Sequence, residues 1–273
     1  MPLTSITSSK RNRLNKVNRV IDNMVNSIDS RIAGKDPAST IKIYDSYNVP
    51  YGTVGSRNSN FWCSSLSAIT CISPRNSYED YARAGTLIAP DMVVFSNHFP
   101  ILSGNSIDFY TMGGSVVTRT IIAQRRIQTT DLMLGKLDSD VPNTIAYAKV
   151  LPKTFYPLFS EVLNNGSVKV PIMSLDQQEH ASVTDTYVQS QNSFFSIPTD
   201  STRLSFYEGT YEYDSGNPSL WVYNNDLIII SVWFGGGLGS PGSGPSFHYY
   251  RDDINSTMTA LSSPYQLTEV VVQ

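Results

Sequence analysis

Residues 213–222 read YDSGNPSLWV, a sharp turn that leads directly into an apolar strand. Gly216 permits the turn because it has no Cβ, and Pro218 stiffens its exit, so Ser215 carries its hydroxyl at a backbone corner. These residue types are common in turns of every kind, so the stretch on its own also fits an ordinary loop. Its meaning depends on the polar side chains that the rest of the chain supplies.

Two upstream segments each place a titratable side chain at the end of an apolar strand. Residues 85–98 read GTLIAPDMVVFSNH, a strand, a turn and a second strand that ends at His98. Residues 130–137 read TDLMLGKL, with Asp131 at the head of another apolar strand. The chain therefore offers a histidine, an aspartate and a serine, in that order, each at a strand end.

The chain after residue 35 has the composition and the turn spacing of a β protein. Sixteen Tyr and eleven Phe, together with many Ser, Thr, Asn and Val, favour strands and turns. Many short strands at even spacing indicate a sandwich or a barrel. Residues 151–165 form the best connector between two halves. The predicted strands are 68–72, 85–88, 92–95, 115–122 and 131–137, then 168–172, 182–188, 204–207, 219–222 and 227–234.

Amphipathic helices are predicted at both ends of the chain. The first begins at Ser8 or Ser9 and ends at Gly34, and its apolar residues recur at steps of three and four. Such a stripe must be buried on the rest of the chain, on a twin chain or on another protein. A second helix covers residues 250–261, and residues 270–272 can add an edge strand. The first stripe consists of Leu14, Val17, Val20, Ile21, Met24, Val25, Ile28 and Ile32.

Charge is distributed unevenly along the chain. The net charge is −3, which argues against a general nucleic-acid binder, so we expect no nucleic-acid partner. Residues 1–35 carry seven Lys or Arg and two Asp, a net of +5, which leaves −8 for the remainder. A basic arm of this kind is either a solvated helix face or a surface for an acidic partner. We expect a protein partner or self-association through residues 10–33.

The cysteines and histidines limit which disulfides and metal sites the chain can form. Cys63 and Cys71 are expected to be buried free thiols, although a link across a turn is geometrically possible. His180 and His248 have no third ligand at a recognisable spacing, so we expect no metal and no cofactor. The N-terminal residues lack an apolar signal core, and no apolar stretch approaches the length of a membrane span, so neither export nor membrane insertion is expected.

The three strand-end segments together resemble the chymotrypsin/trypsin-like serine protease family. Residues 85–98, 131–137 and 213–218 are similar to the family's histidine, aspartate and serine segments, in the order that the family uses. The glycine-rich run at 233–245 resembles its substrate-binding strand and the following loop. The resemblance covers roughly residues 60–262. It implies an all-β fold of two six-stranded antiparallel Greek-key barrels, here with an added N-terminal helix and a C-terminal helix.

The resemblance also implies domain boundaries and residue roles. Residues 1–35 form a basic helical arm, 36–155 the first barrel with His98 and Asp131, and 156–273 the second barrel with Ser215. Ser215 would be the nucleophile, His98 the general base, and Asp131 the group that orients the imidazole. The backbone N–H groups of Tyr213 and Ser215 would form the oxyanion hole. The substrate-binding residues would be Gly209, Trp233, Phe234 and Gly235.

Two positions around the serine give further expectations. Tyr213 stands where the family has a glycine of positive φ, a conformation that costs a bulky residue about 1–2 kcal/mol. A peptide flipped away from that conformation would leave one oxyanion donor and slow hydrolysis. The chain has no counterpart of the family's activation N-terminus before the first barrel, so Asp214 is expected to pair internally.

Two functions remain open on these grounds. The first is a serine endopeptidase that cleaves a peptide or protein substrate through an acyl-enzyme. The second is a protease-fold structural or assembly component of a phage virion or another complex, since DSGNP at 214–218, GSGP at 242–245 and YQLT at 265–268 resemble phage-encoded trypsin-like proteins. The expected location is accordingly cytoplasmic or virion-associated.

Overall fold

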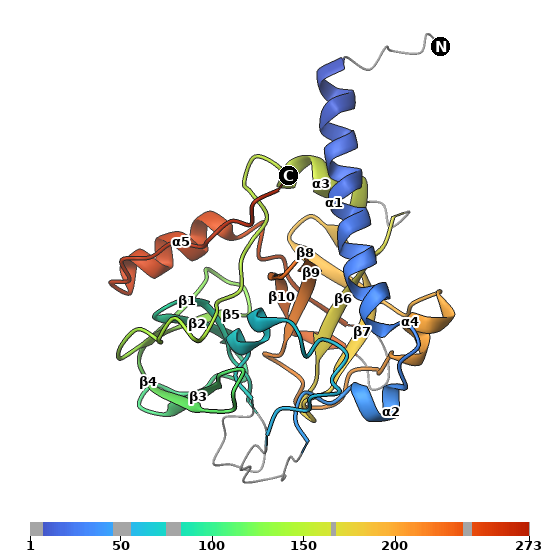
Figure 1. Cartoon of the computed structure of the whole chain (residues 1–273). Helices are drawn as coiled ribbons and strands as arrows, with labels where there is room; N and C mark the ends of the chain where they lie inside the picture. The colour runs from blue at the N-terminus through green and yellow to red at the C-terminus, as the bar shows by residue number, and fades with distance from the viewer. Residues whose placement is uncertain (1–7, 46–55, 75–82, 165–167, 237–241, 273) are drawn as a thin grey trace.

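The computed structural model describes residues 8–45, 56–74, 83–164, 168–236 and 242–272. Within them, two curled antiparallel sheets lie side by side (Figure 1). The first sheet has the order β1-β2-β5-β4-β3 and the second the order β10-β9-β6-β7-β8-β12-β11. The strands of the first sheet are β1 (Thr86–Ala89), β2 (Met92–Ser96), β3 (Ser106–Tyr110), β4 (Val116–Arg126) and β5 (Leu132–Leu137).

The second sheet lies wholly in the later part of the chain. Its strands are β6 (Val170–Leu175), β7 (Ala181–Gln189), β8 (Asn192–Ser196), β9 (Pro218–Tyr223), β10 (Asp226–Val232), β11 (Gly235–Gly236) and β12 (Gly242–Pro245). The helices are α1 (Ser8–Ile32), α2 (Pro37–Thr40), α3 (Tyr156–Leu163), α4 (Ser201–Ser205) and α5 (Arg251–Ala260), with the 3-10 helix η1 (Ser67–Cys71).

The predicted fold class is confirmed: the protein is mostly β, with a helix near each end. The described strands divide five and seven rather than six and six. In the first sheet, residue Ile72 makes only a single bridge to Thr86, and in the second sheet the two-residue β11 adds a short seventh strand. Two curled antiparallel half-barrels with few helices are compatible with a trypsin-like fold.

Two of the predicted strands are helices instead. Residues 68–72 lie almost entirely in η1, where four apolar or small side chains are buried by the surrounding core and not by strand pairing. Of residues 204–207, the first two end α4 and Phe206 is its C-cap; Asp200 caps the start of that helix by accepting hydrogen bonds from the N–H groups of Thr202 and Arg203. Tertiary burial and a local cap thus override strand propensity at these positions.

Residues 151–165 were predicted to form a connector, and residues 270–272 an edge strand. The predicted connector contains α3, and its last residue, 165, lies outside the described residues. Residues 270–272 form no strand; a single bridge joins Glu269 to Val150 nearby.

Both cysteines are free thiols and buried, as predicted, and burial raises the pKa of each to about 12. Among the described helices, none has the combination of length and apolarity needed to cross a bilayer.

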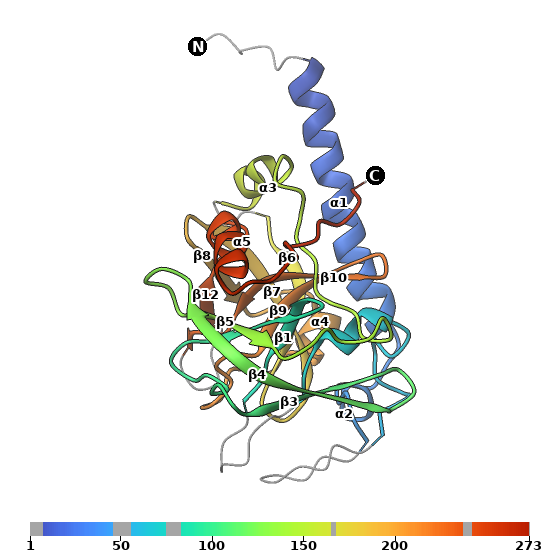
Figure 2. The same cartoon turned by 90° about the vertical axis from the view of Figure 1, so that its left-hand side faces the viewer.

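The apolar stripe of α1 is buried on the protein's own second sheet. Val17 and Met24 are fully buried with the side chains of β6 and β9, and Ile28 and Ile32 belong to a larger core that also contains the first sheet. Asp29 adds two 2.7 Å bonds to the guanidinium of Arg203. The first turns of α1 extend beyond the sheets (Figures 1 and 2). Of the three partners left open for the stripe, the chain itself is the one observed.

Truncation of Ile28 to alanine should destabilise the protein by about 2–5 kcal/mol, because it leaves a cavity between α1 and the core. Asn18→Ala, at an exposed position of the same helix, should change stability by less than about 0.5 kcal/mol. Urea unfolding of the two variants measures both effects. Equal stability of Ile28→Ala and the parent would show that the helix is not part of the folded core.

Candidate active site

The pairing of β2 with β5 places His98 beside Asp131. Ser96 at the end of β2 lies opposite Leu132 at the start of β5, and the two chains run antiparallel. His98 follows Ser96 by two residues, and Asp131 precedes Leu132 by one. The N–H of Asn97 donates to the carbonyl of Asp131 at 2.7 Å, which continues the ladder past the strand ends. The register of the first sheet therefore positions both side chains.

Both carboxylate oxygens of Asp131 are engaged. Oδ1 accepts the backbone N–H of His98 at 2.9 Å, and Oδ2 lies 2.7 Å from His98 Nδ1. The hydroxyl of Ser96 donates to Oδ2 at 2.7 Å and lies 2.8 Å from the same Nδ1. The carboxylate is 7% exposed, so water competes little for these bonds. The imidazole is held with Nε2 directed away from the aspartate.

The serine turn approaches the first sheet closely because Gly216 has no side chain. Gly216 has a φ of +92°, and a Cβ there would lie 3.3 Å from the backbone nitrogen of Ser96 and 3.4 Å from the carbonyl of Ala84. Its N–H donates to the carbonyl of Trp233 at 3.1 Å, and the amide of Asn217 donates to the carbonyl of Asp214 at 3.1 Å. The turn is thereby fixed from both sides.

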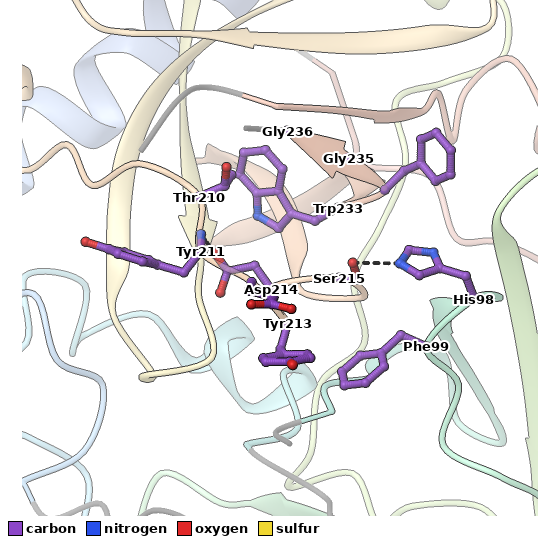
Figure 3. Close-up of a pocket in the computed structure, with 12 residues that line it drawn as sticks. His98, Phe99, Thr210, Tyr211, Tyr213, Asp214, Ser215, Trp233, Gly235 and Gly236 are labelled. Atoms are coloured by element: carbon purple, nitrogen blue, oxygen red, sulfur yellow. Dashed lines mark hydrogen bonds between the residues drawn. The ribbon is translucent and has the colours of Figure 1, made fainter. Parts of the chain in front are cut away.

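The structure brings the three predicted residues together. His98 Nε2 lies 2.8 Å from the hydroxyl oxygen of Ser215 (Figure 3). A hydroxyl in contact with an imidazole, whose other nitrogen contacts a buried carboxylate, can lose its proton as it attacks an electrophile. The side chain of His98 is 46% exposed, so a substrate can reach the pair from solvent.

Tyr213 adopts the backbone conformation that the family resemblance assigns to glycine. Its φ is +76°, in the left-handed region that a tyrosine enters only at a cost of about 1–2 kcal/mol. Its ring lies against that of Phe99, with centroids 6.0 Å apart. Strain of this kind persists where the surroundings hold the backbone in place, and it is concentrated at functional sites. The alternative of a φ typical of tyrosine is not observed.

Asp214 pairs internally, as expected from the missing activation N-terminus. Its Oδ1 accepts the N–H of Gln177 at 3.0 Å, and its Oδ2 accepts the N–H of Tyr211 at 2.7 Å. The side chain is buried, and this burial raises the pKa of the carboxyl to about 6. Asp214 thus connects the segment before Ser215 to the turn between β6 and β7.

A cavity of about 330 Å³ lies beside Ser215. Of the predicted substrate-binding residues, Trp233, Phe234 and Gly235 line it, whereas Gly209 does not. The Trp233 indole is 5% exposed and donates from Nε1 to the carbonyl of Leu175, so it also belongs to the core. The wall is rich in aromatic rings: Phe99, Tyr211, Tyr213 and Trp233 (Figure 3), together with Phe234. Residues 237–241 of the glycine-rich run lie outside the described residues.

Two features of the site were not predicted from the sequence. Ser96 stands two residues before His98, a spacing that places alternate strand residues on one face, and this signal could have identified it. His180 contacts Glu208, which is distant in sequence, so no local spacing could reveal the pair.

His248 has a structural role: Nε2 accepts the N–H of Leu151, and burial lowers the pKa of the imidazole to about 3.

Comparison with known proteins adds no further assignment. No protein-family model matches the chain, and no curated protein matches it.

Replacement of Asp214 by alanine should destabilise the protein by about 2–4 kcal/mol, because the N–H groups of Gln177 and Tyr211 lose their acceptors in a buried setting. Glu212→Ala, two residues earlier and exposed, is the matched control and should be nearly neutral. Thermal and urea unfolding compare the two variants. Equal stability of the two would show that the internal pairing of Asp214 contributes nothing.

Proposed function

We propose that this protein is a serine endopeptidase of trypsin-like fold that hydrolyses peptide bonds through an acyl-enzyme. The observation that carries the proposal is the unbroken series of short contacts from Asp131 through His98 to Ser215, each between 2.7 and 2.8 Å. Such a series is what nucleophilic hydrolysis by a serine requires.

In this mechanism Ser215 attacks the carbonyl carbon of the scissile peptide while His98 Nε2 takes the hydroxyl proton. His98 then donates that proton to the leaving amine, and the ester formed on Ser215 is hydrolysed by water through the same steps. Asp131 holds the imidazole with its protonated Nδ1 toward the carboxylate and stabilises the imidazolium while it lasts. Ser96 adds a second hydrogen bond to that carboxylate.

The oxyanion of the tetrahedral intermediate would be held by the backbone N–H groups of Tyr213 and Ser215. The positive φ of Tyr213 supports this assignment, since it is the conformation that the family uses at the corresponding glycine. One such donor is worth about 3–4 kcal/mol in the transition state, which exceeds the strain of about 1–2 kcal/mol at Tyr213. The strain is therefore a tolerable cost for catalysis.

Two further features support a site that needs no activation cleavage and accepts an apolar side chain. Asp214 already has two backbone donors, so the segment before the nucleophile is held without a newly formed N-terminus. The aromatic wall of the adjacent cavity favours apolar side chains of a peptide or protein substrate.

A fluorophosphonate probe should label the folded protein on Ser215, because this nucleophile is in contact with its base. Ser215→Ala should abolish labelling, and His98→Ala should reduce it by at least a hundredfold. Intact-mass spectrometry measures the adduct. A folded protein that stays unlabelled would contradict the endopeptidase proposal.

Ser96→Ala should slow labelling by about tenfold, because the variant loses a hydrogen bond that holds Asp131 and the imidazole. The matched control is Ser219→Ala, since Ser219 is equally buried and its hydroxyl makes no hydrogen bond among the described residues. The control should label at the parental rate. Equal rates for both variants would exclude a positioning role for Ser96.

The second candidate is an assembly role, in a phage virion or another complex, for a weakly active or inactive protein of the same fold. The observation that favours it is that the start of α1 extends beyond the sheets (Figure 2), and Arg11 and Arg13 in these turns are exposed. These turns offer a basic surface to an acidic partner or a second copy. Absence of probe labelling together with concentration-dependent association would favour this candidate over the first.

A further inference from the structure

Three potential metal ligands converge beside the second sheet, and none of them is one of the three residues of the candidate active site. Asp176 and His180 belong to the turn between β6 and β7, and Glu208 follows α4. His180 Nδ1 lies 2.8 Å from Glu208 Oε2 and 3.6 Å from Asp176 Oδ2. One donor atom from each of the three side chains lies within 4.8 Å of the others.

Asp176 has a buried oxygen that lacks a hydrogen-bond donor. Its Oδ1 accepts the N–H groups of Gln178 and His180 at 2.8 and 3.0 Å, which fixes the orientation of the carboxylate. Its Oδ2 accepts no hydrogen bond from the described residues, although the side chain is only 6% exposed. An unsatisfied buried carboxylate oxygen is costly, and it points toward the two other ligands.

The charges around Asp176 leave a demand for a cation. Asp176 is buried, so little water reaches its carboxylate, and the carboxylates of Asp214 and Glu208 lie close enough to interact with it. The basic side chains that interact with this cluster are those of His180 and Lys42. The side chain of Lys42 is exposed, so water screens its charge. A bound cation would neutralise carboxylates that the protein otherwise leaves partly uncompensated.

We propose that Asp176, His180 and Glu208 form a binding site for a divalent transition-metal ion of the Zn²⁺ type. One imidazole and two carboxylates are a ligand set that Zn²⁺ accepts, and their two negative charges match the charge of the ion. Tetrahedral coordination places ligand atoms about 3.4 Å apart, close to the distances observed. The side chains of His180 and Glu208 are 14% and 30% exposed, which leaves an entry path and room for a water ligand.

A metal ion at this position would crosslink two segments that support the pocket wall. Asp176 and His180 belong to the turn that donates the N–H of Gln177 to Asp214, and Glu208 begins the segment that continues to Tyr213. The ion would hold this segment against the β6–β7 turn. The proposal rests on these ligands alone and does not depend on the proteolytic function.

Titration of the full-length protein, stripped with a chelator, with ZnCl₂ in a calorimeter tests the proposal. One site per chain with micromolar or tighter affinity is expected. His180→Asn and Glu208→Gln should each weaken it at least tenfold, and Zn²⁺ should raise the melting temperature of the parent but not of these variants. Melting temperatures measured in chelator show whether each variant is folded.

The matched control is His98→Asn, since His98 with Asp131 is the other imidazole–carboxylate pair among the three histidines, and His248 is buried. This variant should bind Zn²⁺ with parental affinity. Loss of binding in His98→Asn, parental binding in a folded His180→Asn, or no binding by the parent would each overturn the proposal.

Discussion

The backbone of Gly216 lies against the backbone of Ser96, and a Cβ at Gly216 would be only 3.3 Å from the nitrogen of Ser96. This contact joins the turn that carries Ser215 to the strand end that carries His98, although the two residues come from different sheets. A Cβ at Gly216 would meet a peptide nitrogen and a carbonyl oxygen, neither of which can move without disturbing β1 or β2. The 2.8 Å contact between His98 and Ser215 depends on this approach.

The segment that leads into Ser215 is held by polar contacts that oppose its own strain. Tyr213 has a positive φ, and its neighbour Asp214 is anchored by the backbone N–H groups of Gln177 and Tyr211. Because the anchor is one residue away, the strained peptide cannot relax without breaking buried hydrogen bonds. The nearby cluster of Asp176, His180 and Glu208 acts on the same segment from its other end.

The long helix α1 supports the second sheet and is not a detached arm. Its apolar stripe covers β6 and β9, the strands that lead into the β6–β7 turn and out of the serine turn. Ile28 and Ile32 extend the contact into the core shared with the first sheet. The packing of the helix therefore stabilises the scaffold on which Ser215 is mounted, while its first turns stay outside the sheets.

Strand periodicity and turn residues act over a few positions, so the sequence alone was sufficient to predict the β class and the two terminal helices. His98, Asp131 and Ser215, which the structure brings together, were named through the resemblance of their segments to a known family. Strand prediction failed at residues 68–72 and 204–207, where burial and the Asp200 cap outweigh β propensity. The backbone conformation of Tyr213 and the meeting of Asp176 and His180 with Glu208 could be decided only in three dimensions. Both depend on contacts between segments far apart in the chain, and such contacts cannot be predicted from local residue patterns.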